Sequence, residues 1–191
     1  MVLKNPGRAC IALAASTALL TAAMSSTAAA AAAAAAEPAA TPAQWHAQTL
    51  KFDYTGFTTL YTCDGLEGKV RDILLTFGAR KDLKVRATGC TEGMNRPSRF
   101  AWVTAEFSSL APVVAPAPAD AVQAGWAKVQ IAPNRPSYMG AGECELVEQM
   151  RELLQKGFAL RNTDYRTSCT PHQVSIADYS VTTEALKAAA N

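Results

Sequence analysis

The sequence has few of the residues that catalytic sites usually need. Its 191 residues include only two histidines, His46 and His172, and no Gly-x-Ser-x-Gly, P-loop, Gly-x-Gly-x-x-Gly or EF-hand pattern. None of its five cysteines belongs to a Cys-x-x-Cys pair. These absences exclude the common nucleotide, calcium, zinc-ribbon and serine-hydrolase motifs. We therefore expect neither a metal nor another cofactor.

An excess of charge of one sign is also lacking. Without Lys4 and Arg8, which fall in a segment expected to be removed, the 18 basic residues become 16, against 16 acidic ones. A net charge of zero leaves no basic stripe to neutralise a phosphate backbone, so we expect no nucleic-acid partner. After the first 36 residues no apolar run is long enough to cross a bilayer, so no transmembrane segment is expected in the mature chain.

What is present begins with an export signal. Lys4 and Arg8 precede an apolar run of about 14 residues, 11–24, and an alanine tract, 28–36, with many Ala-x-Ala cleavage sites. Residues 1–36 are therefore interpreted as a signal peptide without a fixed cut, with an uncleaved anchor or a buried helix as the alternative. The Pro/Ala-rich residues 37–50 are expected to be a flexible tether. The mature protein should be periplasmic or secreted.

The mature chain keeps four cysteines: Cys63, Cys90, Cys144 and Cys169. An even number of cysteines in an exported protein favours disulfides. Four buried free thiols are the alternative, and a zinc site is less favoured because histidines are so few.

Two segments have the one-sided apolar spacing of an amphipathic helix. The first runs from Leu66 to Phe77, and the second, 80 residues later, from Leu146 to Leu154. Asp64 and Glu67 have the form of a capping box for the first helix, and Gly78 suits its end. Glu143 and Glu145 form a second acidic pair, which we interpret as stabilising a helix N-terminus rather than as acid–base catalysts.

Strand-like segments flank both helices in the same order. They are Phe57–Thr62, Leu83–Thr88 and Phe100–Phe107 in one half, and Ala127–Ile131, Asp164–Ser168 and Val174–Val181 in the other. We predict one α+β domain over 51–191, made of tandem βαββ halves, 51–110 and 125–185. The halves should share a mixed sheet with both amphipathic helices packed on one face. Coincidence and a two-sheet arrangement are the alternatives.

This topology predicts the disulfide pairing. In a strand–helix–strand crossover the two strands are parallel, so their outgoing ends lie at the same edge of the sheet. If those strands are neighbours, the cysteines that follow them come within bridging distance. We therefore expect Cys63–Cys90 and Cys144–Cys169.

Candidate functional residues are few. His172 is interpreted as a surface turn residue, and Glu106 and Asp178 fall at matching places in predicted strands. The strand aromatics, Phe100 and Trp102 among them, are expected mostly in the core.

The tetrapeptide Asn-Arg-Pro-Ser occurs twice, and it is the strongest candidate for a ligand site. Its polar residues are Asn95 and Arg96 in one copy and Asn134 and Arg135 in the other. If both loops lay beside helix N-termini, the two guanidinium groups could bind an anion. Ordinary turn chemistry is the alternative, because Asn and Pro favour turns.

From these residues we expect a non-enzymatic binding or accessory module whose partner is an unknown protein or small-molecule ligand. The alternative is an exported hydrolase-type enzyme whose acidic residues, such as Glu106 and Asp178, converge only in the fold. A pocket with converging carboxylates or His172 would favour the enzyme. A flat, exposed aromatic patch would favour the binding module.

Overall fold

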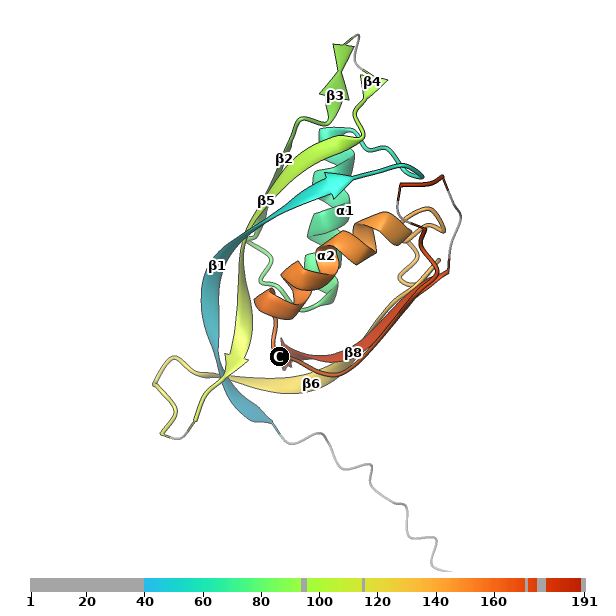
Figure 1. Ribbon diagram of the computed structural model, residues 1–191. Helices are drawn as coiled ribbons and strands as arrows, with labels where there is room; N and C mark the ends of the chain where they lie inside the picture. Colours follow the sequence, from blue (N-terminus) through green and yellow to red (C-terminus); the bar gives the residue numbers. More distant parts are fainter. Residues whose placement is uncertain (1–39, 94–95, 115, 171, 175–177, 190–191) are drawn as a thin grey trace, which may run out of the picture. The chain divides into compact units, whose positions relative to one another are not determined.

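The computed structural model describes residues 40–189, with gaps at 94–95, 115, 171 and 175–177. The expected signal peptide, 1–36, therefore lies outside the described residues. Within them the protein is a mixed α+β fold with two helices, a six-stranded sheet, a two-stranded sheet and two disulfides (Figure 1). Neither of the two described helices combines the length and the apolar character needed to cross a membrane.

Each half of the described chain contains one long helix and three strands of the main sheet. The first half contains β1 (Thr41–Thr55), α1 (Cys63–Thr76), β2 (Lys84–Thr88), the small hairpin β3 (Thr91–Glu92) and β4 (Arg96–Pro97), and β5 (Phe100–Pro112). The second half contains β6 (Val122–Ile131), α2 (Cys144–Gly157), β7 (Leu160–Thr167) and β8 (Tyr179–Ala188).

The strand order in the main sheet is β2-β5-β1-β6-β8-β7, and every neighbouring pair is antiparallel. The prediction of a mixed sheet with adjacent parallel strands was therefore wrong. β1 and β2 do run parallel, but β5 lies between them, and β8 lies between β6 and β7 in the same way. In each half the third strand of the main sheet lies between the other two, which run parallel to each other. The two parallel strands are therefore not neighbours.

The main sheet curves around the two helices, which both lie on its inner side (Figure 1). The core fills the space between them, because inward-facing strand residues meet the apolar stripes of α1 and α2. Phe158, just after α2, contacts Phe77 at 5.6 Å and stacks on Phe107 of β5 at 5.2 Å between ring centroids. Burial of each such ring contributes about 2 kcal/mol through the hydrophobic effect.

Two local predictions in the first half were wrong. The segment expected to be a flexible tether, 37–50, is strand from Thr41 onward, and β1 pairs with β5 over the 13 positions 43–55. The alanines and proline of this segment gave no strand pattern in the sequence, because the strand is held mainly by backbone pairing with β5. Residues 57–62, expected to be a strand, form a loop instead, because two of their N–H groups bond to Glu145 of α2.

The predicted disulfide pairing is confirmed. Cys63 bonds to Cys90 with Cα atoms 5.2 Å apart, and Cys144 bonds to Cys169 with Cα atoms 5.9 Å apart. The geometric reason differs from the one expected. Each bridge joins the first residue of a helix to the second residue after the strand that follows it.

The capping box expected for α1 was also wrong. The N-cap is Thr62, whose hydroxyl accepts a hydrogen bond from Gly65 N at 3.2 Å. Glu67 instead accepts from Ala87 N of β2 at 2.9 Å. At the other end Gly78 has φ of +99°, and the amides of Gly78 and Ala79 bond back to the last helical turn, which is the glycine ending that the sequence predicted.

Candidate functional site

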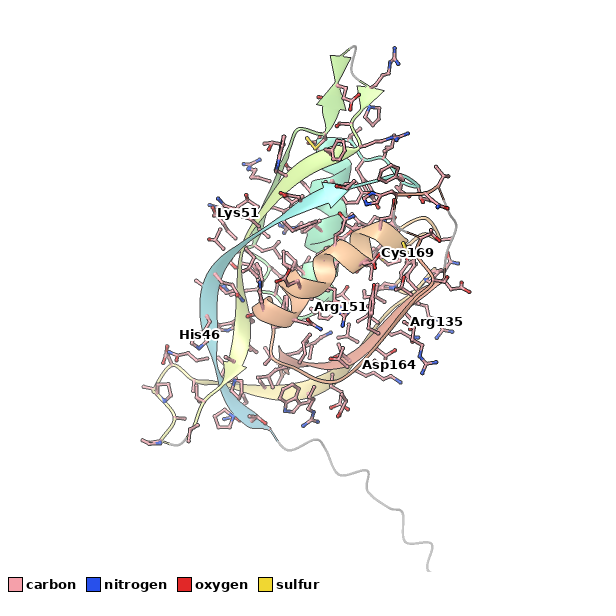
Figure 2. All side chains as sticks on the ribbon, in the orientation of Figure 1. His46, Lys51, Arg135, Arg151, Asp164 and Cys169 are labelled. Carbon is pink, nitrogen blue, oxygen red and sulfur yellow. A yellow bond between two sulfur atoms is a disulfide. The ribbon has the colours of Figure 1, made fainter. Side chains whose placement is uncertain are left out.

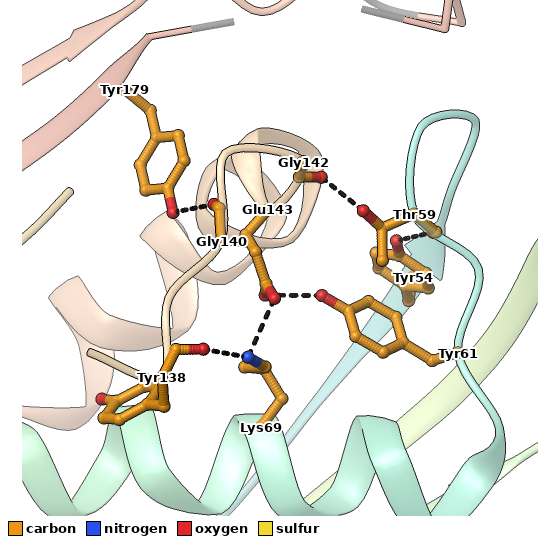
Figure 3. A network of polar contacts seen from close by, with 9 residues as sticks. All are labelled: Tyr54, Thr59, Tyr61, Lys69, Tyr138, Gly140, Gly142, Glu143 and Tyr179. Atoms are coloured by element: carbon orange, nitrogen blue, oxygen red, sulfur yellow. Dashed lines mark hydrogen bonds and ion pairs between the residues drawn. The ribbon is translucent and has the colours of Figure 1, made fainter. Parts of the chain in front are cut away.

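A network of largely buried polar side chains lies where loop 56–62 meets loop 132–143 and the start of α2 (Figure 3). Glu143, the N-cap residue of α2, forms an ion pair with Lys69 of α1 at 2.8 Å and accepts a hydrogen bond from the Tyr61 hydroxyl at 2.5 Å. Lys69 also donates to the backbone carbonyl of Tyr138. A single carboxylate thus connects α1, α2 and both loops.

Three further contacts complete this polar network, and each ends on a backbone carbonyl. The Tyr54 hydroxyl donates to Thr59 O at 2.5 Å, the Thr59 hydroxyl donates to Gly142 O at 2.7 Å, and the Tyr179 hydroxyl donates to Gly140 O at 2.7 Å. Figure 3 shows the participants of these contacts around Glu143.

The tyrosines of the polar network stay protonated in the neutral pH range. Burial raises the pKa of Tyr54 and Tyr179 well above the usual value near 10, and nearby carboxylates add to the shift. Burial, followed by the hydrogen bond to Glu143, raises the pKa of Tyr61 further. Each of these neutral hydroxyls donates its proton to a fixed acceptor, so the bonds hold the two loops in place.

A small pocket lies beside the polar network. It has a volume of about 60 Å³ and is lined by Thr55, Phe57, Glu145, Glu148, Gln149 and His172. The imidazole of His172 contacts the Phe57 ring edge-on, with centroids 5.2 Å apart. A pocket of this volume can hold a few water molecules.

The outer side of the first half carries exposed aromatic rings. Phe100 is 55% exposed and Trp102 is 60% exposed, so the expectation that these strand aromatics are core residues was wrong. Trp102 lies in register with Asp53 of β1 and Thr88 of β2, on the side of the sheet away from the helices. We call Phe100, Trp102, Asp53 and Thr88 together the outer aromatic face.

The position of Trp102 is well defined by the backbone beneath it. Its ring lies against Gly89, where φ is +77° and a Cβ atom would stand 2.5 Å from a ring carbon. Further along the same strands an open depression of about 490 Å³ is bordered by Lys84, Glu106 and Ser108. The outer aromatic face therefore continues into a polar hollow.

The two Asn-Arg-Pro-Ser copies are not brought together. Asn95 lies outside the described residues, and Arg96 is exposed in β4, which Figure 1 places in a hairpin at one tip. Asn134 adopts φ of +62° in the turn after β6, and Arg135 lies 3.5 Å from Gln130 Oε1 (Figure 2). The distance between these two places does not support one anion site shared by both copies.

The acidic residues expected to converge also lie apart. Glu106 is on the outer side of β5, in register with Thr49 and Lys84. Asp178 precedes β8, and its backbone pairs with Ser168. Within the described part of the chain there is no group of three or more His, Cys, Asp or Glu side chains that could hold a metal ion.

Sequence reasoning missed the polar network itself. Its acidic member, Glu143, was noticed only as a helix-start residue, and Lys69 and Tyr61 lie about 80 positions away in the chain. No local pattern links such distant residues.

Comparisons with known proteins give no family to which this chain can be assigned. No family model matches it, and searches of curated proteins and of solved structures found no similar protein.

Proposed function

We propose that the protein is an exported, non-enzymatic binding module that contacts its partner through the outer aromatic face. The observation that carries this proposal is the exposure of Phe100 and Trp102, at 55% and 60%, on a side of the sheet that no described helix covers. They are two residues apart on one strand, so their Cα atoms are about 7 Å apart and their side chains leave the same face of the sheet. Exposed neighbouring aromatics of this kind are typical of contact surfaces.

The interior supports the same proposal against the hydrolase alternative. The hydroxyls of Tyr54, Tyr61 and Tyr179 already donate to fixed acceptors, and the pocket beside them has only about 60 Å³. A hydrolase needs a base within reach of a substrate-sized cavity. Glu106 borders the open depression of about 490 Å³ on the outer side of the sheet, and Asp178, which precedes β8, is not among the described residues that line it.

We further propose that the two halves descend from one duplicated βαββ unit with an amphipathic helix on the inner side of the sheet. Both helices have 14 residues and begin at a disulfide cysteine. Arg80, three residues after Phe77, lies over the Trp45 ring at 5.8 Å. Arg161, three residues after Phe158, lies over the Trp126 ring at 4.4 Å. The third strand is central in each half.

Export is supported by the two disulfides, which persist in oxidising compartments and are rare in reducing ones. Mass mapping of the cysteines in protein recovered from the cell envelope or the medium tests this part. We expect a processed N-terminus and both bridges intact; an unprocessed chain with four free thiols would overturn the assignment.

The binding proposal is tested by following the three indole N–H signals of Trp45, Trp102 and Trp126 in ¹H–¹⁵N NMR spectra. The probes are soluble oligosaccharides, anionic and neutral lipid vesicles, and an extended aromatic peptide. We expect one probe class to shift or broaden the Trp102 signal saturably while the Trp45 and Trp126 signals stay in place.

A matched pair of variants makes the test specific. The double change Phe100→Ser and Trp102→Ala should weaken binding at least tenfold. The double change Gln130→Ala and Thr182→Ala, at paired positions on β6 and β8 of the other half, should leave binding unchanged. Equal binding by both variants, or no response of the Trp102 signal to any probe, would refute the proposal.

A further inference from the structure

Beyond Trp102 on β5, the outer side of the sheet continues as two rows of polar side chains. Alternate residues of a strand leave the same face, so Thr104 and Glu106 lie on the side of Phe100 and Trp102. We call the residues of these two rows the outer polar strip: Thr104 in register with Lys51 and Arg86, and Glu106 in register with Thr49 and Lys84. From Trp102 to Glu106 the strand is about 14 Å long. The strip therefore gives an elongated surface that begins at the aromatic rings.

The charged side chains of this surface are exposed and nearly balanced in sign. Lys51, Lys84 and Arg86 are positive, and Glu106 and the neighbouring Asp53 are negative. Among the residues that the structure describes, none of these five side chains takes part in an ion pair. Ammonium and guanidinium groups only donate hydrogen bonds, and ionised carboxylates only accept them. The surface thus presents donors and acceptors that are not engaged with one another.

The open depression of about 490 Å³ lies at the far end of the outer polar strip. Lys84 and Glu106 border it, together with Ser108 and Asp82. Asp82 is already paired with Arg80 at 2.8 Å, so Glu106 supplies the carboxylate of the depression that is open to a ligand. Ligand sites in proteins commonly have volumes of about 300–1,000 Å³, and the depression falls within that range.

The two rings at the other end are open for stacking. Phe100 and Trp102 are both more than half exposed, and no described lysine or arginine lies over either ring. Contact with the backbone at Gly89 holds the Trp102 ring in place. Little conformational entropy is therefore lost when a flat group packs on this ring.

We propose that the outer aromatic face and the outer polar strip together bind a linear, neutral oligosaccharide; this inference rests on the proposed function and names its ligand. The C–H face of one sugar ring packs on Trp102, and the hydroxyls of the following sugars bond to the outer polar strip. A hydroxyl group both donates and accepts hydrogen bonds, so a chain of hydroxyls matches a surface of separate donors and acceptors. A polyanionic chain is disfavoured by Asp53 and Glu106, and a polycationic chain is disfavoured by the three cations.

The experiment titrates wild-type protein with cellohexaose, maltohexaose and N-acetylchitohexaose, with the disaccharide of each series, and with hexagalacturonate as the acidic equivalent. The readouts are the Trp102 indole N–H signal and the backbone amide signals of Thr104 and Glu106 in ¹H–¹⁵N NMR spectra. We expect at least one neutral hexasaccharide to shift all three signals saturably, with an affinity at least tenfold above that of its disaccharide and of hexagalacturonate. Because the ligand is uncharged, raising the ionic strength should leave this affinity unchanged within twofold.

Matched double variants separate the outer polar strip from a general effect of surface charge. Lys84→Ala with Glu106→Ala removes one cation and one anion beside the depression and should lower the hexasaccharide affinity at least fivefold. Asp164→Ala with Arg166→Ala removes an exposed ion pair of 3.0 Å on β7, in the other half, and should bind like wild type. Thermal melts and the masses of both disulfides check that each variant is folded.

The inference is overturned if no neutral hexasaccharide moves the three signals, if the disaccharide or hexagalacturonate binds as tightly, or if the two double variants bind equally. A lipid vesicle or peptide that moves the Trp102 signal while every oligosaccharide fails would overturn the oligosaccharide assignment and leave the binding module in place. No response of Trp102 to any probe would overturn both. The wild-type titration needs no variant, so the inference is decided even where a variant does not fold.

Discussion

The two helices begin differently, although each has 14 residues and starts at a disulfide cysteine. At the start of α1 the Thr62 hydroxyl bonds to its own helix, at Gly65 N. At the corresponding place before α2, Glu143 makes no cap bond to its own helix and reaches instead to Tyr61 and Lys69 of the first half. At the start of α2, the contacts of Glu143 with Tyr61 and Lys69 therefore take the place of a local helix cap and join the two halves.

The residues after Glu143 extend this difference. Glu145 and Gln149 of α2 bond to the backbone of residues 55–58, whereas α1 sends Glu67 and Arg71 to its own following strand and turn. Glu67 and Arg71 of α1 thus bond within their own half, although Lys69 of the same helix reaches Glu143. Glu145 and Gln149 of α2 hold the loop of the other half. Three measurements test this difference between the two helices.

The largest effect should come from removing either disulfide, and here the halves should behave alike. The bridges span sequence separations of 27 and 25 residues, so loop-closure entropy predicts a loss of about 3.5 kcal/mol in the free energy of unfolding for each. Urea unfolding of Cys63→Ser/Cys90→Ser and Cys144→Ser/Cys169→Ser measures both. Losses that differ by more than about 1.5 kcal/mol would show that the halves are not equivalently stapled.

The next effect should separate the halves. Glu143→Gln leaves the Lys69 ammonium without its counter-charge among buried tyrosines, which should cost about 3 kcal/mol of unfolding free energy. Thr62→Ala, at the matching position, removes only a helix cap and should cost about 1 kcal/mol. Chemical denaturation of the two variants checks the ratio. Equal losses would mean that Glu143 is no more than another cap.

The smallest effect concerns alkaline pH. Burial raises the pKa of Tyr61 and Tyr179 in the folded protein above the unfolded value near 10, so their contribution to stability is complete below pH 10 and falls as the pH rises above it. Each tyrosine should add about 1 kcal/mol to the loss between pH 10 and 11, because the unfolded side chain is only partly deprotonated there. Tyr61→Phe and Tyr179→Phe should each remove that much slope between pH 10 and 11, as measured by urea unfolding. If Tyr179→Phe leaves the slope of unfolding free energy against pH unchanged, Tyr179 of the second half is not part of the polar network.

Local patterns in the sequence predicted the features that depend on local spacing. The apolar stripes predicted α1 and α2, and the alternation of Leu83 to Thr88 predicted β2. Both bridges were predicted correctly from a strand–helix–strand crossover, although the parallel strands assumed to be neighbours are not. Each of these depends on residues within about 30 positions of one another.

The features that sequence reasoning missed depend on contacts between distant residues. The order of strands is decided by where β5 and β8 insert, and an Ala/Pro-rich segment became β1 because 13 pairs with β5 hold it. Phe100 and Trp102 gave no sign of facing outward, since their strand is apolar on both faces. Lys69 and Glu143 meet only after two loops have folded together.

The two outer edges of the sheet are finished differently. Glu67 and Arg71 of α1 occupy the backbone of Ala87, Leu83 and Lys81 beside β2. Along β7, no described side chain bonds to the outward backbone, and a bulge at Asn162 with φ of +54° interrupts the strand. The β2 border of the sheet is thus closed by side chains of its own helix, whereas the β7 border is broken by a change of register within the strand.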